Sequence, residues 1–357
     1  MEENGGLTTF WVEPKPAEAY HGVVGSPLVR LLQESSVSKH RFPVVWSMAV
    51  VVVLSAISAG AAPAAADPSK RVLFITIDGL RPDVALRADM PNLRDLMARG
   101  SFTFWAQTTR VAITLPSHCT LLTGVSPEKH GVTWNSDSAA DKLPNGPKVP
   151  TIFELAKGAG LSTAMVAGKA KFSIFQKPGA LDWSVVGAKG SLSDEQAGEA
   201  ASRILMEHQP TVMFIHFTLT DTTGHAKGWG SPEQLRTVSG ADLALGQVLK
   251  TLDKLQLRDK TLIILTADHG GAALTHGGED PRSKHIPWIV TGPGVRANYD
   301  LALDKDLTVK IEDSFATALD FLGLPIPGYC EGKVVRQIYA AAPSKLPAKQ
   351  EAPAYAN

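Results

Sequence analysis

The run Val72-Leu-Phe-Ile-Thr-Ile-Asp78 decides the fold of this chain. The six residues before Asp78 are apolar or β-branched, a composition that predicts a strand buried on both faces. Similar runs lie at Thr211–Thr220 and Thr261–Ala267, and an aspartate follows each of them, Asp221 and Asp268. In open α/β sheets, ligands bind at the carboxyl ends of the strands. We therefore expect the three aspartates to converge at one edge of a sheet.

Predicted strands and helices alternate along the rest of the chain. Further strands are expected at Ser101–Arg110, Ser162–Ala167 and Ile286–Thr291. Helices are expected at Pro91–Arg99, after the capping-box pair Thr151 and Glu154, and at Glu195–His208, Pro232–Leu255 and Ile311–Leu322. The alternation predicts an α/β fold with a mostly parallel central sheet sandwiched by helices, in a single domain at residues 67–340.

The composition excludes several classes of protein. The 357 residues include 35 Lys and Arg and 35 Asp and Glu, so no global charge attracts a nucleic-acid polymer or an acidic membrane. Two cysteines, Cys119 and Cys330, are too few for a disulfide scaffold or a thiolate metal site. A single bridge between them stays open.

The N-terminal region predicts export. Residues 42–66 carry no charge, follow Lys39, His40 and Arg41, and end in three alanines. This pattern is typical of a signal peptide, and the stretch is also long enough for an uncleaved signal-anchor in the membrane. Both alternatives place the following domain in the periplasm or outside the cell. Residues 1–41 are expected to be a disordered extension, and residues 341–357 a disordered tail.

Three histidines accompany the three aspartates in short motifs. His225 closes Asp221-Thr-Thr-Gly-His225, His269 follows Asp268 directly, and His276 lies in a Thr-His-Gly-Gly stretch. Carboxylate oxygen and imidazole nitrogen are ligands that Zn²⁺ prefers. The six residues therefore predict a site for two divalent metal ions, with zinc favoured, although Mn²⁺ or Fe also suits so carboxylate-rich a site.

The other histidines are weighed against this set. His285 precedes a predicted strand and rivals His276 as a ligand, but the Thr-His-Gly-Gly context favours His276. His118, His130 and His216 are interpreted as structural.

The stretch Thr114-Leu-Pro-Ser-His118 follows a predicted strand and opens a predicted helix. A hydroxyl at a helix N-terminus is well placed against an anion. Threonine becomes a nucleophile when a base or a metal ion removes its proton. Alternatively, Thr114 is a plain N-cap with Pro116 in the first turn, and the spacing alone favours this alternative.

Together, these motifs resemble the alkaline phosphatase superfamily, in its type I phosphodiesterase/nucleotide pyrophosphatase-like branch. The resemblance covers roughly Arg71 to Tyr339. The motifs that carry it are Ile77-Asp-Gly-Leu-Arg81, Thr114-Leu-Pro-Ser-His118, Ser126-Pro-Glu-Lys-His-Gly131 with Asn135, Asp221-Thr-Thr-Gly-His225, Asp268-His-Gly270, His276-Gly277 and Ile286-Pro-Trp-Ile-Val-Thr-Gly-Pro-Gly294. It implies an alkaline phosphatase-like catalytic domain at residues 67–340.

The resemblance also implies a role for each site residue. One metal ion would be held by Asp221, His225 and His276. The second would be held by Asp78, Asp268, His269 and the Thr114 oxygen. Thr114 would be the nucleophile that takes the phosphoryl group, and Asn135 and the Thr114 backbone N–H would bind a non-bridging oxygen. The Leu-Pro-Ser-His after Thr114 replaces the Cys/Ser-x-Pro-x-Arg motif of sulfatase relatives, which argues against sulfatase activity.

Lys169 and Lys171 leave the class of ester open. Both fall on one side of the chain if the Gly168-Lys-Ala-Lys171 stretch is extended. Some phosphomonoesterases and phosphonoacetate hydrolases of the superfamily carry a similar pair, which contacts the dianionic phosphoryl group or the substrate carboxylate. We therefore assign both lysines to substrate binding, with two solvated surface lysines as the alternative.

The sequence thus predicts an exported two-metal hydrolase of small phosphoric esters. The motif set as a whole favours a phosphodiesterase or nucleotide pyrophosphatase. The two lysines instead favour a phosphomonoesterase or phosphonoacetate hydrolase. A phosphoryl transferase is a more distant alternative.

Overall fold

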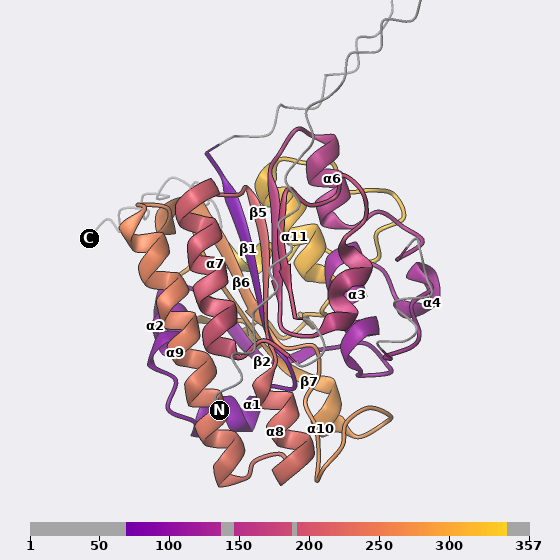
Figure 1. Ribbon diagram of the computed structural model, residues 1–357, viewed down its shortest axis with the longest axis vertical. Coiled ribbons are helices and arrows are strands. Elements are labelled where there is room, and N and C mark those ends of the chain that lie inside the picture. The colour runs from indigo at the N-terminus through magenta and orange to yellow at the C-terminus, as the bar shows by residue number, and fades with distance from the viewer. Residues whose placement is uncertain (1–68, 137–145, 188–190, 341–357) are drawn as a thin grey trace, which may run out of the picture. The chain divides into compact units, whose positions relative to one another are not determined.

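The computed structural model describes residues 69–136, 146–187 and 191–340 (Figure 1). The predicted extension at residues 1–41, the apolar segment 42–66 and the tail 341–357 lie outside the described residues. Within the described ranges, no helix has the length and apolarity needed to span a bilayer.

A single eight-stranded sheet organises the described residues, in the order β4-β3-β5-β1-β6-β7-β2-β8. Its strands are β1 (Arg71–Ile77), β2 (Ser101–Gln107), β3 (Thr163–Ala167), β4 (Trp183–Val186), β5 (Val212–Phe217), β6 (Thr261–Thr266), β7 (His285–Thr291) and β8 (Tyr299–Asp300). The pairs along β4-β3-β5-β1-β6 are all parallel, and β7 runs antiparallel to both of its neighbours. The predicted α/β fold with a mostly parallel sheet is confirmed.

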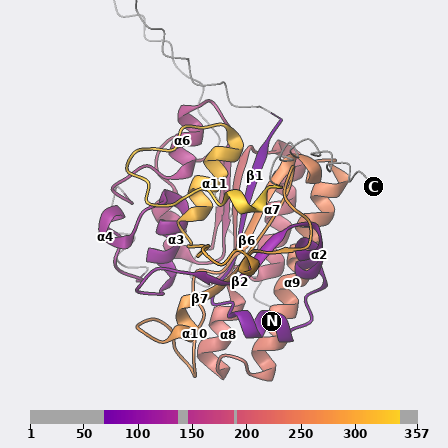
Figure 2. The same cartoon turned by 180° about the vertical axis from the view of Figure 1, so that it is seen from behind.

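Helices cover both faces of this sheet. Helices α2 (Pro91–Arg99), α7 (Asp194–His208) and α9 (Pro232–Lys254) pack together on the face seen in Figure 1. Helices α3 (Thr114–Thr123) and α11 (Asp313–Leu322) pack together on the opposite face, which comes forward in Figure 2. The remaining helices are α1 (Pro82–Arg87), α4 (Pro127–His130), α6 (Ile152–Gly158), α8 (Leu219–Lys227) and α10 (Pro281–Lys284). The sheet is therefore sandwiched, as predicted.

The central strands explain the uniform apolar runs of the sequence. β5 and β6 are buried along their whole length, and β1 is buried from its second residue on. Because helices cover both sheet faces, neither side of these strands can carry a polar residue at low cost. The runs are continuous rather than alternating for this reason.

Local signals set the helix ends that the sequence predicts. Thr151 and Glu154 form the expected capping box, with the Thr151 N–H donating to Glu154 Oε2 at 2.8 Å. Gly323 closes α11 in the left-handed conformation. Ser193 and Gln196 form a second capping box at the start of α7, which satisfies two backbone N–H groups at the helix end.

One predicted element is wrong in a way that matters for function. The run Thr211–Thr220 is not one strand, because β5 ends at Phe217 and α8 begins at Leu219. The carboxylate of Asp194 accepts hydrogen bonds from the Thr218 and Leu219 N–H groups at 2.7 and 3.1 Å. This contact from α7 turns the backbone into a helix. Asp221 therefore lies in the first turn of α8 rather than at a strand end.

Three smaller expectations are also corrected. The stretch after β3 is not extended, because Ala170–Phe175 forms the 3₁₀ helix η1. The strand predicted at Ser101–Arg110 ends at Gln107. Cys119 and Cys330 are both free thiols, so no bridge joins them.

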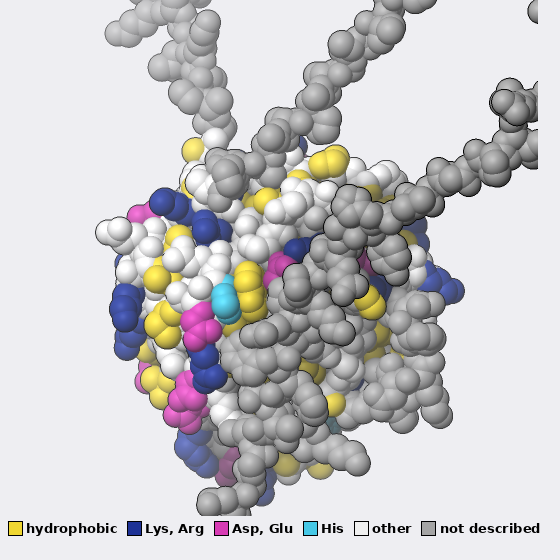
Figure 3. All heavy atoms as spheres, turned by 45° about the horizontal axis from the view of Figure 1, so that its top comes forward, with side chains coloured by type: hydrophobic (Ala, Val, Ile, Leu, Met, Phe, Trp, Pro, Cys, Tyr) yellow, Lys and Arg dark blue, Asp and Glu magenta, His cyan; other side chains and the backbone are white. Residues whose placement is uncertain are grey.

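On the face shown in Figure 3, acidic and basic side chains of the described residues lie next to each other, in agreement with the balanced charge.

Candidate metal centre

The three aspartates meet because their strands are neighbours. β1 pairs with β5 on one side and with β6 on the other. Asp78 follows β1 directly, and its N–H continues the ladder to Phe217 O at 2.9 Å. Asp268 follows β6, and its Oδ1 accepts the Gly79 N–H at 3.0 Å. Adjacent parallel strands thus bring residues 189 positions apart into contact at one sheet edge.

Gly79 is required for this approach. It has a positive φ of 71°, and a Cβ built on it would lie 3.2 Å from both Cα and Cβ of Asp221. Any other residue would be strained by its backbone conformation and would also crowd the helix that carries Asp221. The glycine after Asp78 thus lets α8 approach β1.

Each aspartate has one oxygen without a partner. Among the described residues, none makes a hydrogen bond to Asp78 Oδ1, Asp221 Oδ1 or Asp268 Oδ2, although all three atoms are buried. Imidazole Nε2 atoms face these oxygens instead. His269 Nε2 lies 3.4 Å from Asp78 Oδ1 and 3.2 Å from Asp268 Oδ2. His225 Nε2 and His276 Nε2 lie 3.4 and 3.7 Å from Asp221 Oδ1.

All three imidazoles are held in the same tautomer. His225 Nδ1 contacts Leu274 O at 2.9 Å, His269 Nδ1 contacts Gly270 O at 2.8 Å, and His276 Nδ1 contacts Ala112 O at 3.0 Å. A carbonyl oxygen only accepts, so each Nδ1 carries the proton and each Nε2 offers a lone pair. The three lone pairs therefore point toward the unpartnered carboxylate oxygens. This is the arrangement that metal-binding histidines adopt.

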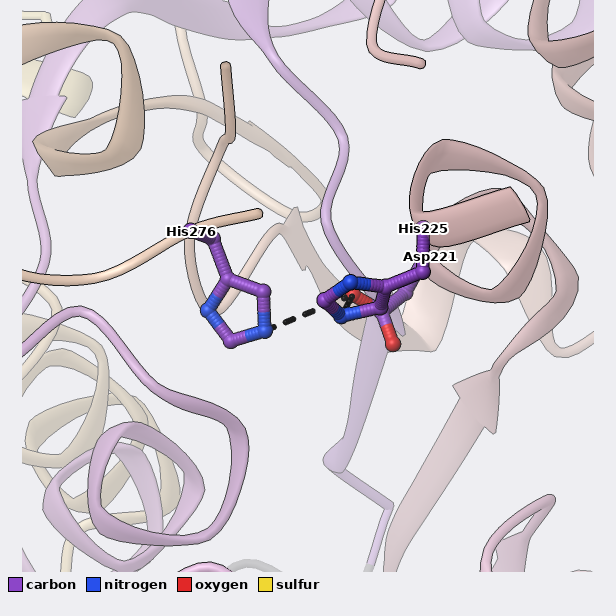
Figure 4. A group of neighbouring side chains, drawn as sticks. All are labelled: Asp221, His225 and His276. Carbon is purple, nitrogen blue, oxygen red and sulfur yellow. Dashed lines mark ion pairs between the residues drawn. The ribbon is translucent and has the colours of Figure 1, made fainter. Parts of the chain in front are cut away.

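Two overlapping groups of side chains can each hold a cation. Asp221, His225 and His276 form one, in which both rings turn toward Asp221 (Figure 4). Asp78, Asp221 and His269 form the other. Asp221 therefore lies between the two groups, and Asp268 contacts the second through His269.

Burial and charge set the protonation of this cluster. Burial alone would raise the pKa of Asp78, but Lys169 and the hydrogen bond from His216 outweigh it and hold this pKa well below its usual range. Burial and the negative charge of Asp78 raise the pKa of Asp268 well above its usual value. Burial, followed by the proximity of His276, lowers the pKa of His269 to about 4. His269 is therefore neutral near pH 7 and can act as a ligand.

These residues fit two divalent cations. Three buried carboxylates lie together, and Lys169 offsets only part of their charge. Buried polar atoms without partners are costly, and a divalent ion satisfies several of them at once. The donor set of carboxylate oxygen and imidazole nitrogen suits Zn²⁺, Mn²⁺ or Fe.

Thr114 lies beside the buried group. It is the first residue of α3, it is 1% exposed, and its Oγ1 lies 3.3 Å from His269 Nε2. Ile113 rather than Thr114 occupies the N-cap position. The alternative reading of Thr114 as a plain N-cap is therefore wrong. His118 supports the turn, with Nδ1 donating to Thr114 O at 2.8 Å and Nε2 next to Thr76 Oγ1 at 3.0 Å.

Asn135 and the two lysines lie around the same centre, but the lysines diverge. Asn135 Oδ1 accepts from the Leu115 N–H at 3.0 Å and from Lys171 Nζ at 3.2 Å. Lys169 instead reaches 2.7 Å from both Asp78 Oδ2 and Asp221 Oδ2. The backbone of η1 separates the two side chains, because the residues after Lys169 are not extended.

The remaining histidines separate into different roles. His285 stacks edge-on against Trp105 and belongs to neither cation group of the described residues. His130 contacts Thr120, away from the aspartates. His216 touches the centre directly, with its Nε2 2.9 Å from Asp78 Oδ2. The sequence signal for His216 was a histidine inside an apolar strand, which needs a buried partner.

Comparisons with known proteins identify the family of the chain. The family model described as type I phosphodiesterase / nucleotide pyrophosphatase matches residues 72–281. An uncharacterized pyrophosphatase/phosphodiesterase of Schizosaccharomyces pombe is 27% identical over 218 residues, which cover 56% of this chain and 44% of the relative. Human ectonucleotide pyrophosphatase/phosphodiesterase family member 7 is 28% identical over 250 residues, which cover 64% of this chain and 54% of the relative. The chain thus spans about half the length of these relatives.

Solved structures share the fold. Murine ectonucleotide pyrophosphatase / phosphodiesterase 5, as an inactive variant in complex with AMP, has a TM-score of 0.66 at 16% identity. The match covers 76% of this chain and 100% of that chain. Because the family model matches more than half of the 357 residues, this chain belongs to the type I phosphodiesterase / nucleotide pyrophosphatase family.

Proposed function

We propose that this chain, whose family indicates a hydrolase of phosphoric esters, is an exported two-metal phosphodiesterase that acts through a covalent threonine intermediate. One observation carries the proposal. Three imidazole lone pairs face three buried carboxylate oxygens that make no hydrogen bond, and the Thr114 hydroxyl lies 3.3 Å from one of these imidazoles, that of His269.

The residues divide between two ions as follows. Asp221, His225 and His276 would hold one ion, and Asp78, Asp268, His269 and the Thr114 oxygen would hold the other; the side-chain groups Asp221/His225/His276 and Asp78/Asp221/His269 and the contacts of His269 support this division. Bound in this way, the ions would lower the pKa of the Thr114 hydroxyl and neutralise the leaving oxygen, with these roles reversed for the attacking water.

Thr114 takes the phosphoryl group in the first of two displacements. Its Oγ1 forms a bond to phosphorus, the bond between phosphorus and the leaving oxygen breaks, and the hydroxyl proton is transferred through solvent to the leaving oxygen. In the second displacement, water forms a new bond to phosphorus, the bond between phosphorus and Thr114 Oγ1 breaks, and a proton from the water returns to Oγ1. Asn135 is fixed near the reacting oxygen by the Leu115 N–H, and we assign its amide group to a non-bridging oxygen.

A diester of a nucleotide is the proposed substrate. The murine relative was solved with AMP, and the motif set favours the diesterase type. The second candidate, a phosphomonoesterase or phosphonoacetate hydrolase, would need Lys169 and Lys171 on the substrate. Both lysines already contact protein groups, namely the Asp78 and Asp221 carboxylates and Asn135. This favours the diester.

Export rests on the N-terminal sequence. The uncharged segment 42–66 and the alanines before Asp67 are typical of a cleaved signal. N-terminal sequencing of the chain from fractionated cells should find Asp67 or a nearby residue at the start in the exported fraction. An intact Met1 on cytoplasmic protein would contradict export.

Thr114→Ala is the direct test of the nucleophile. We expect kcat/KM for bis-p-nitrophenyl phosphate to fall by at least about 10³-fold, as expected when a nucleophile is removed, while zinc content stays near that of the wild type. Thr123→Ala is the matched control, because Thr123 is buried on the same helix and its hydroxyl donates to Cys119 O. Retained turnover in Thr114→Ala would remove Thr114 from its role.

A substrate panel separates the two candidate functions. The zinc-loaded chain is assayed with bis-p-nitrophenyl phosphate, a nucleotide diester, p-nitrophenyl phosphate and phosphonoacetate. The proposal expects the highest kcat/KM for a diester. A preference for p-nitrophenyl phosphate or phosphonoacetate would instead establish the second candidate.

A further inference from the structure

Lys169 is a buried cation between two carboxylates. It lies just after β3, at the start of η1, and its side chain is only 14% exposed. Its Nζ lies 2.7 Å from Asp78 Oδ2 and 2.7 Å from Asp221 Oδ2. These aspartates come from β1 and from α8, so the ammonium group ties a strand end to a helix.

The lysine and the imidazoles use opposite oxygens of the same carboxylates. Nε2 of His269 faces Asp78 Oδ1 at 3.4 Å, and Nε2 of His276 faces Asp221 Oδ1 at 3.7 Å. Lys169 contacts Oδ2 of both aspartates. The ammonium group therefore does not lie in the space between the imidazoles and the Oδ1 atoms. Lys169 and two metal ions can be accommodated together.

His216 contacts the same oxygen of Asp78 as Lys169 does. The Gly168 N–H donates to His216 Nδ1 at 3.2 Å, so the ring proton is on Nε2. That Nε2–H donates to Asp78 Oδ2 at 2.9 Å. Oδ2 thus receives Lys169 and His216 together, which leaves Oδ1 as the oxygen available to a metal ion.

We propose that Lys169 is a positioning residue that holds Oδ2 of Asp78 and Asp221 and so presents Oδ1 of each to the two metal ions. This role differs from the substrate contact that the sequence suggested for Lys169. It rests on the proposed function only in that the site must bind metal. Partners that orient metal ligands in this way usually contribute 10- to 100-fold, roughly, to metal affinity.

The test compares Lys169→Met with Lys177→Met. Lys177 is a matched control, because its side chain is 17% exposed and it pairs with Glu154 at 3.1 Å, away from the centre. Zinc dissociation constants are measured by competition with a chromogenic chelator. We expect Lys169→Met to weaken zinc binding by roughly 10- to 100-fold and Lys177→Met to leave it unchanged. Unchanged or tighter zinc binding in Lys169→Met would overturn the proposal.

A measurement on the wild-type chain covers the case in which Lys169→Met fails to fold. Lysines are methylated reductively and mapped by mass spectrometry, for metal-free protein, for zinc-loaded protein, and for zinc-loaded protein with inorganic phosphate. A positioning residue stays protected in all three states, while exposed lysines react. Lys169 that reacts until phosphate is added would instead be a substrate ligand, and the proposal would be wrong.

The outcome is independent of turnover. Weakened zinc binding in Lys169→Met, together with no diester hydrolysis by the wild type, would contradict the proposed function and keep the role of Lys169. Normal diester hydrolysis by the wild type, together with unchanged zinc affinity in Lys169→Met, would support the proposed function and contradict the positioning role of Lys169.

Discussion

Asp78, Asp268 and His269 are fully buried behind the ends of β1 and β6, whereas His225 reaches solvent with 44% of its side chain exposed. We call the first three residues the buried half of the centre. Asp221, His225 and His276 form the other half, which we call the exposed half after His225, although Asp221 itself is buried. The buried half follows directly from strand pairing. The exposed half lies on a helix and a loop, which the sheet does not fix.

The exposed half is held by contacts from distant parts of the chain. Asp194 of α7 binds the first N–H groups of α8. Trp229 packs edge-on against His225 and donates to Gly79 O at 2.9 Å. A sheet edge therefore positions metal ligands through strand pairing alone, whereas a helix that carries ligands needs contacts from other parts of the chain. Changes to that support should therefore act on the exposed half first.

Removing a ligand of the exposed half should have the largest effect. We expect His276→Ala to lower zinc content from about two ions to about one per chain. Turnover should fall on the order of 10³-fold, since charge stabilisation by a metal ion is worth several kcal/mol. Metal analysis and diester assays check this. His285→Ala is the control, since His285 contacts Trp105 instead, and zinc loss confined to His285→Ala would reverse the assignment.

The contact between the Asp194 carboxylate and the start of α8 should make the free energy of unfolding depend on pH. Burial raises the pKa of Asp194 to about 6 from an ordinary value of 3.8. Ionisation therefore opposes folding, and this cost grows as the pH rises from about 4 to about 6. Asp194→Asn keeps an acceptor for both N–H groups and removes the charge.

The expected result for Asp194→Asn is a gain relative to the wild type. Between pH 4 and pH 6, the variant's free energy of unfolding should increase over that of the wild type by on the order of 3 kcal/mol. Above about pH 6 the difference should be constant. Urea unfolding of metal-free protein at several pH values measures it. A difference that is flat from pH 4 to 6 would show that Asp194 carries no such cost.

Substitution of Trp229 should have the smallest effect on stability. Because Trp229 contacts both His225 and Gly79, this effect should link the two halves. Trp229→Phe keeps a ring against His225 but loses the hydrogen bond to Gly79 O. We expect the free energy of unfolding to fall by about 1 kcal/mol and zinc to leave the exposed half more readily under chelation. Trp183→Phe, on the edge strand β4 and stacked on His208, is the control. Equal zinc release in both variants would argue against Trp229 as a support.

The sequence alone predicts where the residues of the buried half lie. It predicts the positions of the exposed half less well. Asp78 and Asp268 end continuous apolar runs, and such runs pair as neighbouring strands. The position of Asp221 was misassigned, because the β5 strand stops where Asp194 binds it, and this contact spans 24 residues of sequence. No local pattern reports a capping carboxylate that comes from another helix.

The lysines and His216 show a second limit. Alternation along an extended chain predicts that Lys169 and Lys171 lie on one side, but the 3₁₀ turn of η1 separates them. His216 was interpreted as structural, although a histidine inside the apolar strand β5 already required a buried acceptor. The residue types indicate that these side chains belong to the site. Their partners, in contrast, depend on how β1, β3 and β5 pack side by side.

Trapping the covalent intermediate tests the central claim most directly. The zinc-loaded chain is mixed with bis-p-nitrophenyl phosphate and quenched in acid during turnover, and its peptides are analysed by mass spectrometry. We expect a phosphoryl group, still carrying the non-leaving ester, on the Thr114 side chain, and no such adduct in Thr114→Ala. An adduct on a different residue, or turnover by Thr114→Ala at the wild-type rate, would contradict it.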